Sequence, residues 1–239
     1  MELDTDSLDI KIAGFRKTSL MDYPDNISTV LFTQGCNCRC PYCHNPGLIG
    51  QEVEKNYMDL SYFRDFLKER QHLLDGVVIT GGEPTLQKDI IPFIKNIKNR
   101  EMKVKLDTNG SRSDILKKLM QAQLIDYIAL DIKAPYNKYK KITGNDNMVS
   151  EVKRSVELVL ESKIPHEFRT TVVPDLHHKK DISKIADSIR GADKYYIQNF
   201  RSEITLDVEL QDSREFPETK LEEFKKIAEN YLEEVEIRN

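Results

Sequence analysis

The sequence predicts an α/β protein with a parallel sheet, arranged as a partial (β/α)6 TIM-type barrel. Short runs of β-branched and aromatic residues alternate about six times with longer segments of helical period. That alternation is typical of right-handed βαβ units laid into one sheet, and six units favour an open or partial barrel over a closed eightfold one. No long Gly/Ser or Pro linker interrupts the 239 residues. We therefore expect one domain over residues 1–239, with residues 1–25 as an N-terminal preamble.

Six predicted strands are short and rich in β-branched or aromatic residues, as strands covered on both faces should be. In chain order they occupy 29–32, 77–79, 104–106, 127–130, 168–173 and 195–197. Helices are predicted between and after them, from apolar stripes with spacings of three and four. These stripes run over 60–74, 90–97, 115–119, 152–160, 182–189 and 221–232. A tail containing Val235 and Ile237 would add an edge strand.

Composition argues against several classes of protein. The chain has 40 acidic and 36 basic residues and a formal net charge of −4, which gives no electrostatic footprint for nucleic acid. No stretch approaches the ~18 uncharged apolar residues that span a bilayer. The acidic N-terminus lacks the basic region and apolar run of a secretory signal. We expect a cytoplasmic protein that binds neither nucleic acid nor membrane.

All four cysteines lie within eight consecutive residues, directly after the first predicted strand: Cys36, Cys38, Cys40 and Cys43. A disulfide framework joins distant segments, so this crowding indicates one site in a reducing compartment. Taking Cys36, Cys40 and Cys43 gives a CxxxCxxC loop, and three thiolates from one tight loop suit a cubane iron-sulfur cluster. Because such a cluster normally takes four cysteines, one iron would keep an open position for chemistry.

A structural zinc site that uses all four sulfurs is the alternative. It would require Cys36 and Cys38, one residue apart, to bind the same tetrahedral ion. Structural zinc sites usually pair two separated Cys/His knuckles, and the histidines of this chain show no matching spacing. These features favour the cluster, with Cys38 as a bystander thiol.

Glycine-rich or polar segments accompany the later strands, at the edge where ligands gather in such folds. They are Gly81, Gly82 and Glu83 after the second strand, Asp107, Thr108 and Asn109 at the end of the third, Asp131 and Lys133 after the fourth, and Arg169 within the fifth. A Gly-Gly pair lets the backbone approach a ligand, and the Glu83 carboxylate can accept hydrogen bonds from an ammonium. An inward-pointing Arg169 would need an anionic partner. Taken singly, each segment is also explained as a turn or an ion pair at a strand end.

The cysteine loop, with Tyr42 just before its third cysteine, resembles that of the radical S-adenosylmethionine (SAM) superfamily. The resemblance implies the radical SAM fold and a 4Fe-4S cluster on Cys36, Cys40 and Cys43, whose fourth iron chelates the amino and carboxylate groups of SAM. It also implies that the Gly-Gly-Glu-Pro segment at 81–84 binds the methionine amino group.

Other segments resemble the glycyl-radical-enzyme activases within that superfamily. Residues 15–36 look like the amino-terminal half of anaerobic ribonucleoside-triphosphate reductase activating proteins. The segments at 107–110 and 131–133 resemble activase elements near the methionine carboxylate and ribose. The implied cofactor-binding set is Tyr42, Gly81, Gly82, Glu83, Asp107, Thr108, Asn109, Asp131, Lys133 and Arg169.

The resemblance implies reductive cleavage of SAM to methionine and a 5'-deoxyadenosyl radical, which takes a hydrogen atom from a glycine of a partner enzyme. The partner would be an anaerobic ribonucleoside-triphosphate reductase, and the electron donor a reduced ferredoxin or flavodoxin. No catalytic side chain is assigned, because the cofactors carry the chemistry. Two alternatives stay open: a radical SAM enzyme acting on a small metabolite, and an iron-sulfur electron-transfer or thiol-disulfide protein. We expect the pair His177 and His178 to lie in a solvated loop.

Overall fold

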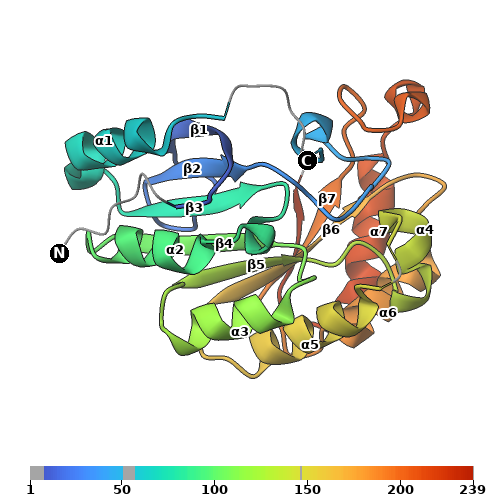
Figure 1. The fold of residues 1–239 in the computed structure, drawn as a ribbon. Helices are drawn as coiled ribbons and strands as arrows, with labels where there is room; N and C mark the ends of the chain where they lie inside the picture. Colours follow the sequence, from blue (N-terminus) through green and yellow to red (C-terminus); the bar gives the residue numbers. More distant parts are fainter. Residues whose placement is uncertain (1–7, 51–56, 146, 239) are drawn as a thin grey trace. The chain divides into compact units, whose positions relative to one another are not determined.

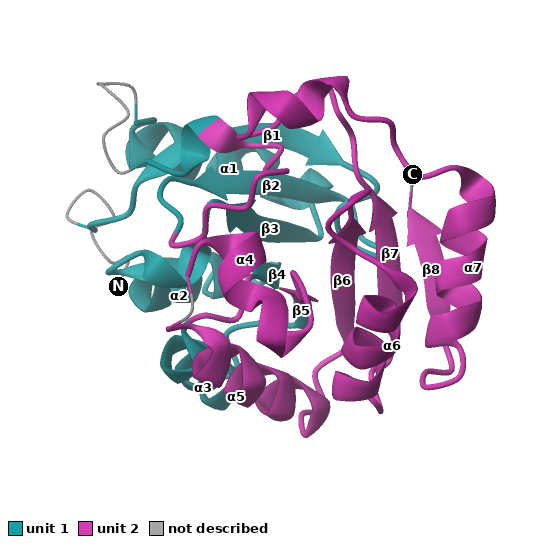
Figure 2. Ribbon diagram, turned by 90° about the vertical axis from the view of Figure 1, so that its right-hand side faces the viewer, with its two compact units in different colours: residues 1–36, 47–108, 112–128 teal, residues 37–46, 109–111, 129–239 magenta. Residues whose placement is uncertain are grey.

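The computed structural model describes residues 8–50, 57–145 and 147–238, which fall into two compact units (Figure 2). Unit 1 comprises residues 1–36, 47–108 and 112–128, and unit 2 comprises residues 37–46, 109–111 and 129–239. Each unit is described by itself. The single domain over residues 1–239 stays a prediction, and residues 1–7 of the expected preamble lie outside the described residues.

Unit 1 contains four complete strands. They are β1 (Ile12–Ser19), β2 (Ser28–Thr33), β3 (Gly76–Gly81) and β4 (Lys103–Thr108). The last three contain the predicted runs and pair in parallel in chain order, β2 with β3 and β3 with β4. Strand β1 pairs antiparallel with β2 and was not predicted. Only its end residues Ile12 and Ser19 are buried, so no apolar run marks it in the sequence, and pairing with β2 is what makes it a strand.

Three predicted helices lie in unit 1. They are α1 (Leu60–Arg70), α2 (Ile90–Lys98) and α3 (Ser113–Gln121), with 3-10 turns η3 (Gln71–Leu73) and η4 (Pro84–Leu86). Asp59 caps α1 by accepting a hydrogen bond of 2.9 Å from the Ser61 backbone N–H. The helix ends earlier than its apolar stripe, so Leu74 is buried beyond η3 rather than within α1. The turn η2 (Pro46–Leu48) crosses the boundary between the two units.

Unit 2 contains the later strands and helices. Strand β5 (Tyr127–Asp131) begins in unit 1 and ends in unit 2. The other strands are β6 (His166–Val172), β7 (Tyr195–Asn199) and β8 (Val235–Arg238), which pair in parallel in chain order. The helices are α4 (Tyr139–Thr143), α5 (Val149–Leu160), α6 (Lys179–Ser188) and α7 (Glu218–Ala228), with 3-10 turns η5 (Tyr136–Lys138) and η6 (Val208–Asp212). Helices α6 and α7 pack on each other, and α7 contacts β7 and β8, all of which are labelled in Figure 2.

The predicted chain order of the fold is confirmed. Each strand from β2 to β7 is followed along the chain by a helix, which gives the six expected βα units, and the tail forms β8. The helix α4 was not predicted, because five residues are too few to show a helical period. In the part of the chain that the structure describes, no helix combines the length and the apolar character needed to cross a bilayer.

Candidate active site

The Gly-Gly-Glu turn after β3 lies against the end of β2 within unit 1. The backbone N–H of Gly82 donates to the Thr33 carbonyl at 2.9 Å, and that of Glu83 donates to the Gly35 carbonyl at 2.8 Å. Gly81 has φ +117°, a backbone conformation that favours glycine. A Cβ on Gly82 would lie 2.1 Å from the Gly35 carbonyl oxygen. In the structure, both glycines therefore allow a close approach of the turn to its own chain, immediately before Cys36.

We expect Gly82→Ala to lower the free energy of unfolding by roughly 1–3 kcal/mol, because a backbone carbonyl cannot move aside as a flexible side chain would. Gly47→Ala is the matched control, since nothing lies within 4 Å of a Cβ at that position. Urea unfolding of the apoprotein, followed by circular dichroism, measures both. Equal midpoints for the two variants would show that the turn relaxes without cost.

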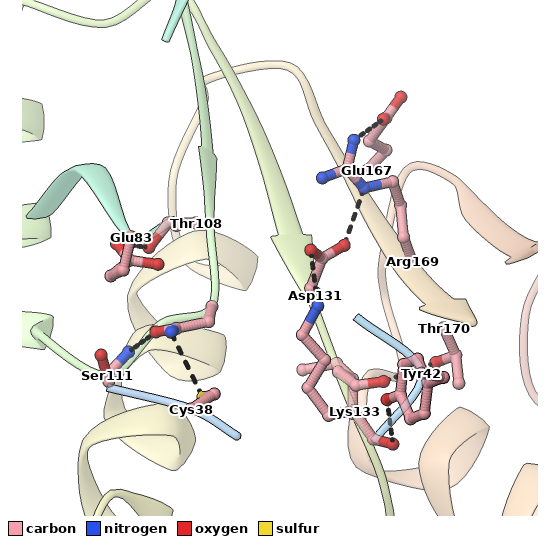
Figure 3. A network of polar contacts seen from close by, with 12 residues as sticks. Cys38, Tyr42, Glu83, Thr108, Ser111, Asp131, Lys133, Glu167, Arg169 and Thr170 are labelled. Carbon is pink, nitrogen blue, oxygen red and sulfur yellow. Dashed lines mark hydrogen bonds and ion pairs between the residues drawn. The ribbon is translucent and has the colours of Figure 1, made fainter. Parts of the chain in front are cut away.

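The Glu83 carboxylate joins two of the predicted segments within unit 1. Its side chain is buried, and Oε1 accepts a hydrogen bond from Thr108 Oγ1 at 2.7 Å (Figure 3). Oε1 also accepts from the Thr85 backbone N–H at 3.0 Å. The Thr85 hydroxyl donates to the same oxygen. The structure thus brings Glu83 together with Thr108. Thr85 was missed, since a threonine after Glu-Pro carries no distinct signal.

Asp107 pairs with a buried lysine of the same strand. Lys105 places Nζ 2.6 Å from Asp107 Oδ1, and its side chain keeps only 2% of its exposure. A buried ammonium needs an opposite charge, so this pair satisfies both groups. Sequence reasoning did not identify Lys105 as a site residue, because a single polar residue between Val104 and Leu106 is ordinary in a strand.

Two glutamines hold the base of the cysteine loop in unit 1. The Gln34 side chain donates to the carbonyls of Gly47 at 2.9 Å and Gly50 at 2.8 Å, on the returning end of the loop. Gln87 donates to the Gln34 carbonyl at 2.6 Å and accepts from the Lys11 backbone at 2.8 Å. Neither glutamine was predicted, because their roles depend on contacts between segments distant in the sequence.

Asp131, Lys133 and Arg169 form one ionic group in unit 2 (Figure 3). Lys133 Nζ lies 2.9 Å from Asp131 Oδ2, and Arg169 Nε lies 2.8 Å from Oδ1. Arg169 Nη1 also lies 3.7 Å from Oε1 of the buried Glu167, and Glu167 Oε2 forms a second ion pair with Arg238 Nη2 at 3.3 Å. The structure therefore brings together three residues of the predicted set and adds two that were missed.

The charges of this group shift each other's titration. Burial by itself would raise the pKa of Asp131, but the positive charges of Arg169 and Lys133 outweigh it and hold that pKa well below its usual value. For Lys133, burial opposes the charged form, and Asp131, followed by Cys40, outweighs it, so the pKa is raised. Asp131 and Lys133 are both ionised at neutral pH.

Three aromatic side chains surround the backbone of Lys133 within unit 2. His177 Nε2 lies 2.9 Å from the Lys133 carbonyl oxygen, to which the Tyr42 hydroxyl also donates at 3.4 Å. The Lys133 backbone N–H donates to the Tyr139 hydroxyl at 3.2 Å. His177 is 1% exposed, so the expectation of a solvated loop was wrong for it. His178 is exposed and caps α6 with Asp181. His177 turns inward because both of its ring nitrogens form hydrogen bonds with backbone groups.

The same contacts predict a pH dependence of stability. His177 Nδ1 accepts from the Val173 backbone N–H at 3.1 Å, so the neutral ring carries its proton on Nε2. Burial is the main cause that lowers the pKa of His177 in the folded state. Its unfolded value is about 6.5, so the contribution of neutral His177 is complete above that pH. This contribution is lost as the pH falls toward the folded-state value.

We therefore expect the loss of unfolding free energy between pH 7 and pH 5 to be smaller in His177→Gln than in the unchanged chain. A depression of one pKa unit corresponds to about 1.4 kcal/mol. Urea unfolding at several pH values measures the difference. Parallel curves for the two proteins would contradict the assignment of a neutral buried ring.

Cys38 is held by protein contacts in unit 2. Its side chain is 2% exposed, and Sγ lies 3.6 Å from Met148 Sδ and 3.5 Å from Asn109 Nδ2. Asn109 also donates to Asn37 Oδ1 at 3.0 Å, so this predicted cofactor-binding residue supports the loop. Cys36 and Cys43 are partly exposed, and Cys40 is buried.

The donor chemistry of the loop suits a soft metal centre. No disulfide joins the four cysteines, all of which are described. Among the described residues, no group of three or more His, Cys, Asp or Glu side chains is arranged as a set of metal ligands. Three thiols on one loop remain the donor type that iron-sulfur clusters take. The loop therefore fits such a cluster by its chemistry.

Sequence comparison identifies the family. Residues 30–190 match the family described as the radical SAM superfamily. The chain belongs to the radical SAM superfamily. This confirms the resemblance at the level of the superfamily, and it confirms that the protein is a radical SAM enzyme.

Several relatives of this radical SAM chain are curated proteins. A Methanocaldococcus jannaschii protein named as a glycyl-radical enzyme activating enzyme is 35% identical over 237 residues, which cover 95% of each chain. The pyruvate formate-lyase-activating enzyme of Clostridium pasteurianum is 25% identical over 237 residues, 93% of this chain and 98% of its own. A Thermococcus kodakarensis protein named as a GTP 3',8-cyclase is 29% identical over 192 residues, 80% of this chain and 58% of its own.

A solved structure shares the fold. Streptococcus suis SuiB bound to S-adenosylmethionine matches with a TM-score of 0.67 at 15% identity, over 86% of this chain. The chain spans about half of SuiB, 48% of its length, so the likeness concerns the fold alone. It confirms the predicted α/β, partial-barrel fold class.

Proposed function

We propose that this radical SAM enzyme generates a glycyl radical on a partner enzyme, and that the partner is an anaerobic ribonucleoside-triphosphate reductase. The observation that carries the activase proposal is the match in length. The two activase relatives align over 93% or more of this chain and 95% or more of their own. The choice of reductase rests on the segment at 15–36, whose residues resemble the reductase activating proteins.

In this proposal Cys36, Cys40 and Cys43 hold a 4Fe-4S cluster, and SAM binds beside it. When bound, the cluster supplies one electron and SAM supplies the hydrogen-abstracting group. The buried Cys38, in contact with Met148 and Asn109, stays outside the ligand set. The Gly-Gly-Glu turn contributes by fixing the chain at Thr33 and Gly35, one residue before the first ligand.

The ionic group of unit 2 supports binding of one anion. Asp131, Lys133 and Arg169, together with Glu167 and Arg238, hold three positive charges and two negative ones, a surplus of one positive charge. The Lys133 and Arg169 side chains are only 20% and 12% exposed, so a counter-ion would stabilise the surplus charge, and the single carboxylate of the methionine moiety has the matching charge. We assign Lys133 to that carboxylate, and Asp131 and Arg169 to positioning Lys133.

Tyr42 has a separate role in the proposal. Its ring is 4% exposed, and its hydroxyl is fixed on the Lys133 carbonyl. A buried ring two residues after Cys40 and one before Cys43 excludes water from that side of the loop. Exclusion of water protects reactive radical chemistry from side reactions.

A radical SAM enzyme acting on a metabolite is the second candidate function. The relative named as a GTP 3',8-cyclase favours it, since its alignment covers 80% of this chain. That alignment reaches only 58% of the cyclase, so this chain lacks a match to much of it. Membership of the superfamily favours both enzyme hypotheses over an electron-transfer or thiol-disulfide protein.

The deciding experiment uses anaerobically reconstituted enzyme, dithionite, SAM and the anaerobic ribonucleoside-triphosphate reductase of the same organism. We expect 5'-deoxyadenosine and a glycine-centred doublet in electron paramagnetic resonance. The doublet should be lost when the radical-bearing glycine of the reductase is replaced by alanine. A doublet on pyruvate formate-lyase alone would reassign the partner. SAM cleavage that is faster with GTP than without it, in the absence of any glycyl radical enzyme, would favour the metabolite function.

A further inference from the structure

Three exposed apolar side chains lie close together between β7 and α7 in unit 2. We call Ile204, Leu206 and Val208 the apolar strip; they are 58%, 37% and 69% exposed. Single exposed apolar residues are ordinary on protein surfaces. Three within five consecutive residues concentrate exposed apolar surface on one segment, and such a concentration is a mark of interaction sites.

The segment that carries the apolar strip is held in place. Asn199 Nδ2 donates to the Phe216 carbonyl at 3.0 Å and closes its base. The buried Thr205 donates to the Asp207 carbonyl at 2.6 Å, and Asp207 Oδ1 accepts from the Glu209 N–H at 3.1 Å at the start of η6. Thr205, between Ile204 and Leu206, is buried and ties the segment down, which suits a preformed binding surface.

The same segment touches the cysteine loop within unit 2. The Asp207 backbone N–H donates to the Pro41 carbonyl at 2.9 Å, and that of Arg201 donates to His44 Nε2 at 3.4 Å. Pro41 and His44 flank Tyr42 and Cys43 in the sequence. Figure 1 shows the segment in orange beyond the end of β7. The apolar strip is therefore fixed beside two of the proposed cluster ligands.

Charge around the apolar strip restricts what binds there. Residues 201–215 contain five acidic side chains, at 203, 207, 209, 212 and 215, and two arginines, at 201 and 214. A net charge of this sign favours a basic face on the partner and repels an acidic one. An apolar contact rimmed by charges also follows the usual anatomy of a protein interface.

We propose that the apolar strip docks the glycyl radical enzyme, through an apolar segment of that enzyme flanked by lysine or arginine. The inference rests on the proposed function and names the surface that function uses. A glycine inside another protein must be held near the cysteine loop for its hydrogen atom to be taken. A strip anchored on Pro41 and His44 would hold it there.

The test compares two triple serine variants. Ile204→Ser/Leu206→Ser/Val208→Ser removes the apolar strip but leaves Thr205 and Asp207, which anchor the segment. Leu20→Ser/Met21→Ser/Ile27→Ser is the matched control, because these apolar residues are 73%, 86% and 41% exposed in unit 1. The probe is anaerobic ribonucleoside-triphosphate reductase or pyruvate formate-lyase, whichever the unchanged enzyme activates. Anaerobic biolayer interferometry measures affinity, and SAM cleavage without partner measures the intact site.

We expect the strip variant to bind the partner at least about tenfold more weakly, with unchanged SAM cleavage alone. The control variant should bind as the unchanged enzyme does. Glu203→Lys/Glu209→Lys should also weaken binding, and affinity should fall as salt rises.

Unchanged partner affinity in the strip variant would overturn the docking proposal and leave the activase function standing. The proposal is also overturned if the strip variant keeps its affinity for the partner and loses only the ability to be reduced by flavodoxin. A dimer in sedimentation that becomes a monomer in the strip variant would assign the surface to a second copy and overturn it. SAM cleavage with no glycyl radical on either partner would overturn the activase function, and this inference with it.

Discussion

Replacement of Cys36, Cys40 or Cys43 by alanine is expected to abolish the intact 4Fe-4S cluster and reduce SAM cleavage to background. Cys38→Ala is expected to keep both. The reason is the different surroundings of the four thiols. Cys38 and Cys40 are both buried, but Cys38 Sγ lies against Met148 and Asn109, and Cys36, Cys40 and Cys43 have the CxxxCxxC spacing. Removal of a cluster ligand opens a second iron position, and a three-cysteine site has no spare donor to fill it.

Unfolding free energy and cluster content should rank the Cys38 and Cys43 variants in opposite orders. In the apoprotein, Cys38→Ala should lower the free energy of unfolding by about 1 kcal/mol, because a buried contact is lost. Cys43→Ala should change it by less, since the thiol is only partly buried. Iron and sulfide content after anaerobic reconstitution should show the reverse order. A Cys38 variant without a cluster would mean that the triad includes Cys38.

Asp131→Asn is expected to lower the free energy of unfolding by about 3 kcal/mol. The substitution leaves Lys133 and Arg169 with no carboxylate between them, and their side chains are only 20% and 12% exposed. Arg169 still faces Glu167 at 3.7 Å, but Lys133 loses its carboxylate partner, and an uncompensated charge costs more than the pair itself contributes. We take the low end of the usual range because the Asp131 side chain keeps 23% of its exposure. The apparent KM for SAM should rise as well, since Lys133 loses the partner that positions it.

The pH dependence distinguishes this variant from the His177 one. The pKa of Asp131 is lowered in the folded state, so its contribution is present above the unfolded value of about 3.9 and is lost only at more acidic pH. The difference in unfolding free energy between Asp131→Asn and the unchanged chain should therefore be constant from pH 5 to pH 8.

Asp187→Asn is the control, because its pair with Arg190 is 58–60% exposed. Exposed pairs contribute only about 0.2–1 kcal/mol. A control loss as large as that of Asp131→Asn would contradict the role of burial.

Local pattern was enough to predict most elements of the fold. Strands β2 to β7 each contain a short run rich in β-branched or aromatic residues, and α5 shows its buried face as Val152, Val156 and Val159 at spacings of four and three. Strand β1 escaped prediction because its central residues are exposed and it depends on pairing with β2. Helix α4 escaped because it is shorter than the pattern that would reveal it.

The sequence by itself determined the cysteine spacing, the order of the strand-end segments and the membership of the radical SAM superfamily. These are local properties of the chain. Metal ligands that come from one short loop can be recognised from their spacing in the sequence. Only the tertiary structure decided that Cys38 is buried, that Lys105 pairs with Asp107, and that His177 turns inward onto Lys133. It also decided that the glycines of the Gly-Gly-Glu turn accommodate Thr33 and Gly35. Burial and hydrogen bonding between distant segments depend on which backbones pack together, and no single stretch of residues encodes that.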